Sequence, residues 1–133
     1  MLSRDCDSRI SDREVSAINE WLNSDKDFHI MRDHPYHSIS ILAGMWGCRN
    51  GILRNIDITD KIDKWTQFQR KGVDQDFLGQ IIYPLIKDNS LEHDDYGRFN
   101  SKPFPSKMIN KEFVGEIYDE NDIRHPEHYK LIR

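Results

Sequence analysis

The clearest periodicity in the chain lies in residues 11–23, where apolar residues recur every three or four positions. This spacing predicts an amphipathic helix, because residues three and four apart share one helical face. Ser11 can cap its N-terminus, and Glu14 three positions later completes a capping-box pattern. The apolar positions are Val15, Ile18, Trp21 and Leu22.

Two apolar stretches after this helix, residues 28–32 and 39–46, have the character of strands. Between them, Pro35 prevents a helix from continuing and biases His34 toward an extended conformation. Glycine within a strand marks a bulge or a close approach of ligand or backbone, as we expect at Gly44. We therefore predict two strands joined by a polar, histidine-containing loop.

Apolar residues spaced among charges predict two further helices. The first runs through residues 61–70, and the second follows Asp74, Gln75 and Asp76. Pro84 falls inside the second pattern, so we expect that helix to kink or restart near Tyr83. The apolar positions of the second helix are Phe77, Leu78, Ile81, Ile82, Leu85 and Ile86.

The pattern weakens after residue 90. Residues 91–107 mix charge with glycine and proline and predict a structured loop, and residues 113–118 predict a short strand. Residues 119–133 are polar, so we expect a loosely held tail with a short turn of helix. Together these patterns predict an α/β fold, organised as a single domain over residues 1–133.

Composition narrows the classes of function. With 19 basic and 23 acidic residues the net charge is −4, which disfavours a nucleic-acid partner. Two cysteines, Cys6 and Cys48, are too few for a disulfide framework or a zinc quartet, and they suggest a reduced, cytoplasmic setting. No apolar run approaches the roughly 20 residues of a membrane span, and the N-terminus does not resemble a signal peptide. We expect a soluble protein.

Residues 28–51 are unusually dense in histidine, glycine and aromatic residues. They hold three of the six histidines, His29, His34 and His37. No His-x-x-x-His helical pair accompanies them, so the pattern favours ligand contact over a metal site. Ordinary loop positions for the histidines and a core position for Trp46 would also explain the pattern.

Acidic residues occur in two suggestive arrangements. Asp5 and Asp7 are two positions apart, and on an extended chain both would point the same way and could converge on a hard cation. A charged, frayed terminus is the alternative. Asp74 and Asp76 suit the N-terminal end of a helix, where the macrodipole favours acidic residues. Capping does not explain Gln75 between them.

These motifs together resemble sugar-nucleotide-dependent glycosyltransferases of the GT-A fold. The resemblance is to a group of viral and bacterial glycosyltransferase-like proteins with the signatures RDCDSR, here residues 4–9, and FHIMRDHPYH…ILAGMWG, here residues 28–47. In GT-A enzymes an acidic D-x-D motif ends a central strand and binds the metal that holds the donor diphosphate. The resemblance therefore implies Mn²⁺ or Mg²⁺ as cofactor, with Asp5 and Asp7 as ligands.

Two later motifs extend the resemblance. Residues 74–78 are similar to the D-Q-x-x-L motif of the glycogenin and galactosyltransferase-like family, which implies that Asp74 and Gln75 face the sugar at its reacting carbon. Lys102, followed by Pro103 and Phe104, is similar to that family's late Lys-Pro-aromatic motif. It implies that Lys102 contacts the donor phosphate.

His93 resembles the histidine that completes the metal shell in that family. Its spacing from Lys102 is longer than the family's usual spacing, so Asp94 and Asp95 are alternative ligands. The glycine-rich stretch at residues 39–47 looks like the strand that borders the acceptor. The residues expected to bind the acceptor are Arg32, Asp33, His34, His37, Gly44 and Trp46. His34 and His37 could orient or deprotonate acceptor hydroxyls.

The resemblance implies a partial GT-A fold, a mixed sheet flanked by helices whose N-terminal nucleotide-binding half is absent. The expected partners are a nucleotide-sugar donor and a glycan or other hydroxyl acceptor. One alternative is an inactive fragment that forms homodimers or binds a partner through an unpaired sheet edge. Another is a small metal-dependent nuclease built on His29, Asp33, His34 and His37, against which the acidic net charge counts.

Overall fold

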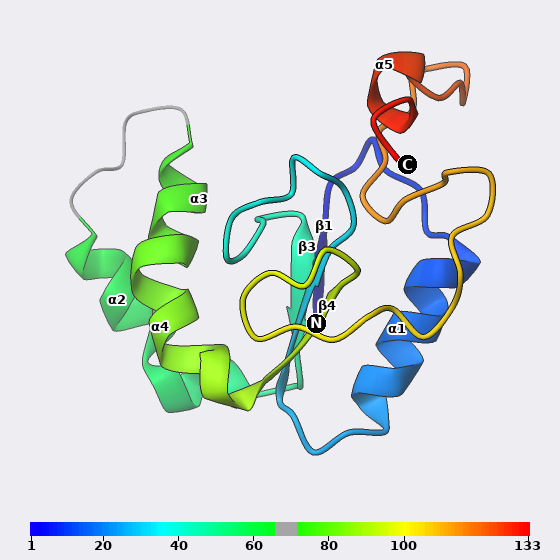
Figure 1. The fold of residues 1–133 in the computed structure, drawn as a ribbon. Helices are drawn as coiled ribbons and strands as arrows, with labels where there is room; N and C mark the ends of the chain where they lie inside the picture. The colour runs from blue at the N-terminus through cyan, green and yellow to red at the C-terminus, as the bar shows by residue number, and fades with distance from the viewer. Residues whose placement is uncertain (66–71) are drawn as a thin grey trace.

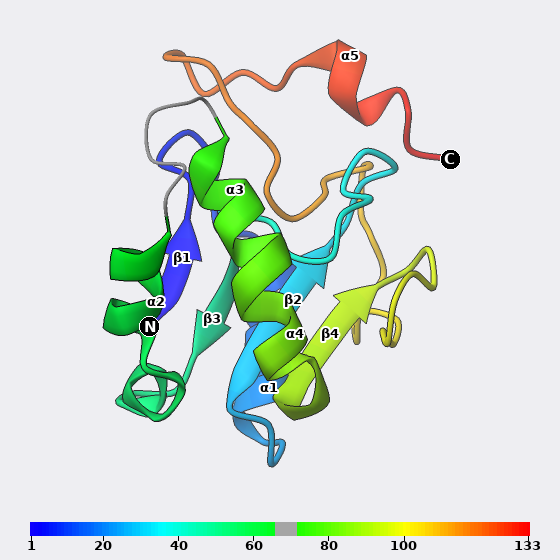
Figure 2. The same cartoon turned by 90° about the vertical axis from the view of Figure 1, so that its left-hand side faces the viewer.

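A four-stranded mixed sheet forms the centre of the computed structural model, which describes residues 1–65 and 72–133 (Figure 1). The strand order is β1-β3-β2-β4. β3 is antiparallel to both of its neighbours, whereas β2 and β4 are parallel. β1, β2 and β4 therefore run in the same direction, and their carboxyl ends lie at one edge of the sheet (Figure 2). The strands are β1 Leu2–Arg4, β2 Phe28–Arg32, β3 Met45–Cys48 and β4 Ser90–Asp94.

Helices cover both faces of this sheet, with α1 on one face and α2, α3 and α4 on the other (Figure 1). The predicted α/β class, a mixed sheet flanked by helices, is confirmed. The α-helices are α1 Asp12–Leu22, α2 Ile58–Lys64, α3 Val73–Phe77, α4 Tyr83–Ile86 and α5 Pro126–Tyr129. The 3-10 helices are η1 Ile52–Ile56 and η3 Lys87–Asn89, and η2 Leu78–Ile82 is a π-helix. Within the described residues, no helix has the length and apolar character needed to cross a membrane.

α1 begins where its cap predicts. The Ser11 hydroxyl accepts a hydrogen bond from the Glu14 amide at 3.2 Å. The Glu14 side chain does not reach back to complete a capping box, because it is buried and paired with Arg4 of β1. The helix is therefore confirmed, but its buried face differs from the apolar stripe, since Val15 and Leu22 are exposed.

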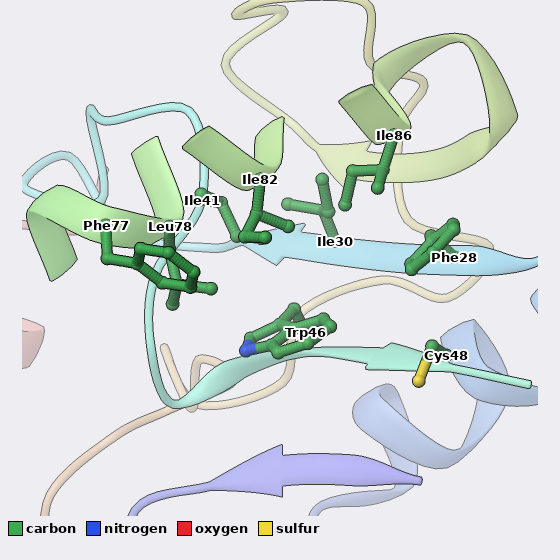
Figure 3. Packing of buried hydrophobic residues seen from close by; sticks show 9 residues of the cluster. All are labelled: Phe28, Ile30, Ile41, Trp46, Cys48, Phe77, Leu78, Ile82 and Ile86. Atoms are coloured by element: carbon green, nitrogen blue, oxygen red, sulfur yellow. The ribbon is translucent and has the colours of Figure 1, made fainter. Parts of the chain in front are cut away.

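The larger hydrophobic core lies between the sheet and the helical run from α3 to α4 (Figure 3). Ile30 of β2 and Trp46 of β3 face Ile82, which is fully buried. The cluster consists of Phe28, Ile30, Ile41, Trp46, Cys48, Phe77, Leu78, Ile82 and Ile86. A smaller cluster under α1 joins Ala17, Met31, Met45, Phe104 and Val114.

The helical run from α3 to α4 accommodates Pro84 through a wider, π-helical turn just before it. Proline has no amide hydrogen and would clash with the carbonyl four positions earlier in a regular α-helix. Leu78–Ile82 adopts π geometry, and the Tyr83 amide donates to the carbonyl of Leu78, five positions before it. The predicted irregularity near Tyr83 is confirmed as this change from π to α geometry. Of the helix predicted over residues 61–70, the first part belongs to α2, and residues 66–70 lie outside the described residues.

The strand predicted at residues 39–46 is wrong for most of its length. Only Met45 and Trp46 belong to β3, and residues 43–44 form a turn. The Met45 amide donates to the Leu42 carbonyl at 3.0 Å, and the backbone before it is bound by Gln75 instead of a neighbouring strand. A side chain more than thirty residues away in the sequence therefore decides the local conformation.

The loop predicted from residue 91 is also wrong, because Ser90–Asp94 forms β4. Its polar sequence hides the strand. Glu92 and Asp94 are buried and pair with Arg32 of β2, so the charges are compensated across the sheet. The Lys102 segment then pairs with the outer side of β4.

The C-terminal residues pack against the carboxyl edge of the sheet. The strand predicted at residues 113–118 is absent from the described structure, where only isolated bridges join Ser8 to Ile117 and Tyr118 to Arg124. Arg124 donates to the buried Glu116 carboxylate at 2.7 Å, and Ile132 is buried. The predicted short turn of helix is confirmed as α5.

Candidate functional site

Three aspartates lie at the carboxyl ends of the parallel strands, which we call the carboxyl edge of the sheet. Asp5 follows β1, Asp33 follows β2 and Asp94 ends β4, and these three strands run in the same direction. Open α/β sheets bind ligands outside the carboxyl ends of their strands. The carboxyl ends of these strands are therefore the candidate site.

Asp5 and Asp7 lie in a tight turn, not on the extended chain that their spacing suggested. The Ser8 hydroxyl donates to the Asp5 carbonyl at 2.9 Å, and the Tyr118 amide donates to the Asp7 carbonyl at 2.9 Å. Both aspartates are exposed. Within residues 1–65 and 72–133, no group of three or more His, Cys, Asp or Glu side chains could hold a metal ion. A cation here would need further oxygen ligands, which substrate phosphates commonly supply.

Gly44 lies directly against Asp5. A β-carbon on Gly44 would fall 2.5 Å from the Asp5 carboxylate oxygen Oδ2, closer than any van der Waals contact allows. Only glycine therefore permits the turn at residues 43–44 and the Asp5 carboxylate to occupy these positions together. Gly44 was expected to border the acceptor; in the structure its close neighbour is the Asp5 carboxylate.

Gln75 secures that turn from the opposite helix. Its amide nitrogen donates to the Ile41 carbonyl, and its Oε1 accepts from the Ala43 amide at 3.0 Å. Both ends of the side-chain amide are used, so Gln75 positions the turn that carries Gly44. Asp74, its neighbour in the first turn of α3, is exposed.

Arg32 is enclosed by ion pairs within the sheet. Its guanidinium is fully buried and pairs with Glu92 at 2.5 Å and with Asp94 at 3.1 Å. It also lies over the ring of Phe99, 4.7 Å from the centroid. These contacts join β2 to β4 and leave the side chain enclosed. Trp46 is likewise enclosed, because it packs in the large core (Figure 3).

Asp33 is enclosed in the same way. Arg13 of α1 donates to its two carboxylate oxygens at 2.8 and 2.7 Å, and the Val114 amide donates at 2.8 Å. Burial raises the pKa of Asp33, and the hydrogen bonds from Arg13 oppose that rise. The carboxylate ties the end of β2 to α1 and to the C-terminal segment.

His34 and His37 meet in a small cavity of about 170 Å³. The His37 Nδ1 accepts from the Asp33 amide at 3.1 Å, and burial lowers the pKa of His37 to about 3. The His34 Nδ1 accepts from the Tyr36 amide at 3.0 Å, and its Nε2 lies 3.0 Å from the His128 carbonyl. We call this cavity the histidine pocket; it is lined by His34, Tyr36, His37, Phe113, Gly115, Ile117 and His128.

His93 and Lys102 lie elsewhere, on the face covered by α1. The His93 Nδ1 is 2.8 Å from the His29 Nε2, and its Nε2 is 3.4 Å from the Glu20 carboxylate, which Lys102 also pairs. Burial lowers the pKa of His93. β4 is three strand positions from β1, a separation of about 14 Å, so the structure does not bring His93 or Lys102 together with Asp5 and Asp7.

The four residues considered for a nuclease fall in three separate environments. His29 stacks on Trp21 beneath α1, Asp33 is held by Arg13, and His34 and His37 line the histidine pocket. They share no metal-binding arrangement within the part of the chain that the structure describes.

Sequence reasoning missed the residues that the C-terminal segment contributes. Phe113, Ile117 and His128 complete the histidine pocket from positions more than seventy residues after His37. No local pattern marks them, because their approach depends on backbone contacts such as the one from Tyr118 to Asp7. Only His128 carries a side chain that suggests chemistry by its type.

Comparison with known proteins adds no family: no family model, no curated protein and no solved structure matches this chain.

Proposed function

We propose that this chain is the catalytic, sugar-transferring part of a GT-A-like glycosyltransferase that uses a nucleotide-sugar donor. The observation that carries the proposal is the cluster at the carboxyl edge of the sheet. There the Asp5 carboxylate lies against Gly44. Gly44 belongs to a second turn, which is held by hydrogen bonds from Gln75, and Gln75 is the neighbour of the exposed Asp74. Motifs far apart in the sequence thus meet where α/β folds bind ligands.

The chemistry of the donor set fits a hard divalent cation. Two exposed carboxylates supply the oxygen ligands that Mg²⁺ and Mn²⁺ prefer, and they leave coordination positions for phosphate oxygens. A bound cation of this kind would offset the negative charge that develops on the diphosphate leaving group. Asp5 and Asp7 would hold it, with the Gly44 turn fixing the position of Asp5.

The roles of the other residues follow from their contacts. Asp74 offers a carboxylate to the positive charge that develops at the reacting carbon of the sugar. Gln75 is a positioning residue, because its amide is fully engaged with the turn at residues 41–43. We assign no donor contact to His93 or Lys102, whose partners lie beneath α1.

Paramagnetic broadening tests the proposal directly. Mn²⁺ added with a UDP-sugar or GDP-sugar should broaden amide signals of residues 5–8, 43–45 and 74 in the ¹⁵N-labelled chain. Asp5→Asn and Asp7→Asn should each abolish this broadening, because each removes an anionic ligand. Asp25→Asn is the matched control, since Asp25 is an exposed aspartate in the loop that enters β2 at the opposite edge of the sheet.

Two results would contradict the proposal. The first is broadening of equal strength in the parent chain and in Asp5→Asn. The second is broadening centred on another acidic surface while residues 5–8 stay sharp.

The open edge of β1 favours a second candidate, a binding module. In the described residues β1 has one neighbouring strand, β3, and its Leu2 is exposed. An unpaired strand edge is a template for pairing with another strand. We propose homodimer formation through this edge as the alternative function; sedimentation velocity should detect a dimer that Leu2→Lys weakens, and a monomer at all concentrations would refute it.

A further inference from the structure

We propose that the histidine pocket binds one uncharged sugar unit of the acceptor, with the His37 Nε2–H donating a hydrogen bond to a sugar oxygen. This inference rests on the proposed function, since it names the substrate class on the acceptor side of the same edge. It assigns one role to His37 and a different one to His34.

The protonated nitrogen of His37 is fixed by the backbone. The Asp33 amide donates to Nδ1 at 3.1 Å, so Nδ1 must carry a lone pair. A neutral ring then bears its hydrogen on Nε2, and burial holds the pKa of His37 near 3, far below neutral pH. Among the described residues, the hydrogen bond of the His37 ring is the one at Nδ1, which leaves Nε2 for a ligand. His37 thus lines the pocket with a donor of fixed orientation.

His34 forms a wall instead. Its Nδ1 accepts from the Tyr36 amide, and its Nε2 is paired with the His128 carbonyl, so both nitrogens are used. The ring of Phe113 lies 4.6 Å from the His34 ring and 5.9 Å from the His37 ring. Aromatic rings present flat apolar surfaces, which suit the C–H face of a sugar ring.

The charge and size of the pocket define the class of ligand. None of the residues that line it is acidic, a lysine or an arginine. The nearby Arg98 donates to Asp94 and to the carbonyls of His34 and Pro35, so its charge is already compensated. Phosphate or carboxylate would therefore lack a counter-charge. The cavity of about 170 Å³ is smaller than the roughly 300 Å³ at which sites for drug-sized ligands begin. Its size therefore suits a ligand with a single sugar ring.

The pocket adjoins the proposed donor site through the backbone. Ile117, which lines the pocket, forms a bridge with Ser8, and the next amide, that of Tyr118, donates to the Asp7 carbonyl. The turn at residues 5–8 and the pocket therefore share one wall. A sugar held by His37 would lie on the same edge of the sheet as Asp5 and Asp7.

Histidine ¹⁵N spectra test this inference without donor or metal. At neutral pH, the methyl glycosides of glucose, galactose, mannose and N-acetylglucosamine are each titrated into the labelled chain. At least one should shift the His37 Nε2 signal and the amides of Tyr36 and Phe113. His37→Asn keeps an acceptor for the Asp33 amide but lacks Nε2, and it should weaken binding about tenfold.

Two further variants separate the pocket from general effects on the fold. Ile117→Trp should fill the cavity and abolish binding while His37 remains intact. His125→Gln is the matched control, because His125 is in the same C-terminal segment but does not line the pocket, and it should bind like the parent chain. Equal affinity in the parent, His37→Asn and Ile117→Trp chains would overturn the inference, as would shifts at His37 with inorganic phosphate but with none of the glycosides.

The two proposals fail separately. Glycoside binding at His37 without Mn²⁺ broadening at residues 5–8 would remove the proposed donor site and leave the sugar pocket. Mn²⁺ broadening at residues 5–8 without any glycoside shift would leave the donor site and remove the sugar pocket.

Discussion

Buried charges at single residues explain how so polar a chain forms a core. Arg32 pairs with Glu92 and Asp94 between two strands, Arg98 adds a second positive charge at Asp94, and Arg13 pairs with Asp33 between a strand and a helix. A buried charge is expensive unless it is paired and hydrogen-bonded. These residues therefore act as structural cross-links, and the acceptor contacts that the resemblance implies for Arg32 and Asp33 stay a prediction.

Arg32→Met tests that assignment. The variant leaves Glu92 buried without its cation and leaves Asp94 paired with Arg98 alone, so we expect the free energy of unfolding to fall by about 3–5 kcal/mol. Urea denaturation followed by circular dichroism measures the change. Arg9→Met, which breaks an exposed pair with Asp122, should change it little. A loss in Arg32→Met no larger than this control would contradict the structural role.

His29 makes stability depend on pH in a defined direction. Burial, with His93 and Arg4 nearby, lowers the pKa of His29 from 6.5 to about 2. Below pH 6.5, His29 is protonated in the unfolded chain but stays neutral in the folded chain. Its contribution to the free energy of unfolding is therefore fully present above pH 6.5 and is lost as the pH falls toward 2. One histidine can change the free energy of unfolding by at most about 1.4 kcal/mol per pH unit. His93 and His37 act in the same direction.

His29→Gln isolates this contribution. Glutamine can keep a hydrogen bond to His93 but does not titrate, so the fall in unfolding free energy between neutral and mildly acidic pH should become shallower. Denaturant titrations over a pH series provide the measurement. An unaltered slope in His29→Gln would mean that His29 accepts a proton readily in the folded protein.

At the scale of elements, the turn at residues 41–44 depends on its neighbours for its conformation. Gly44→Ala places a methyl group where the Asp5 carboxylate lies, and that exposed side chain can rotate away. We expect Gly44→Ala to remain folded and to lose Mn²⁺–nucleotide broadening at residues 5–8. The same NMR titration gives both readouts. At Gly79 the nearest atom to an added β-carbon is 3.8 Å away, so Gly79→Ala should behave as the parent does.

Which elements could be predicted from sequence depends on where their stabilising contacts lie. α1 and β2 were predictable, because a cap and an apolar run are local signals. β4 was not, since Glu92 and Asp94 become compatible with a buried strand only when Arg32 pairs with them. At the site, Asp5, Gly44 and Gln75 were each identified, but their contacts depend on the strand order.

At the scale of the whole molecule, the C-terminal segment packs at the carboxyl ends of the strands, beside the candidate site. Truncation after Tyr118 would leave the buried Glu116 without Arg124 and remove the His128 carbonyl from His34. An unsatisfied buried group costs about 1–3 kcal/mol, so we expect a loss of at least that size in thermal or urea unfolding. Conversely, equal stability of the truncated and full chains would show that these contacts contribute nothing.

The hydrogen bonds of Gln75 have a consequence for how ligands communicate. Asp74 lies in the first turn of α3, Gln75 binds Ile41 and Ala43, and Gly44 touches Asp5, so a continuous series of contacts connects the two carboxylates. We expect a ligand that shifts the first turn of α3 to shift Asp5 as well. Coupling free energies are reciprocal. A cation at Asp5 would then alter affinity at Asp74 by the same factor that occupancy at Asp74 alters affinity for the cation.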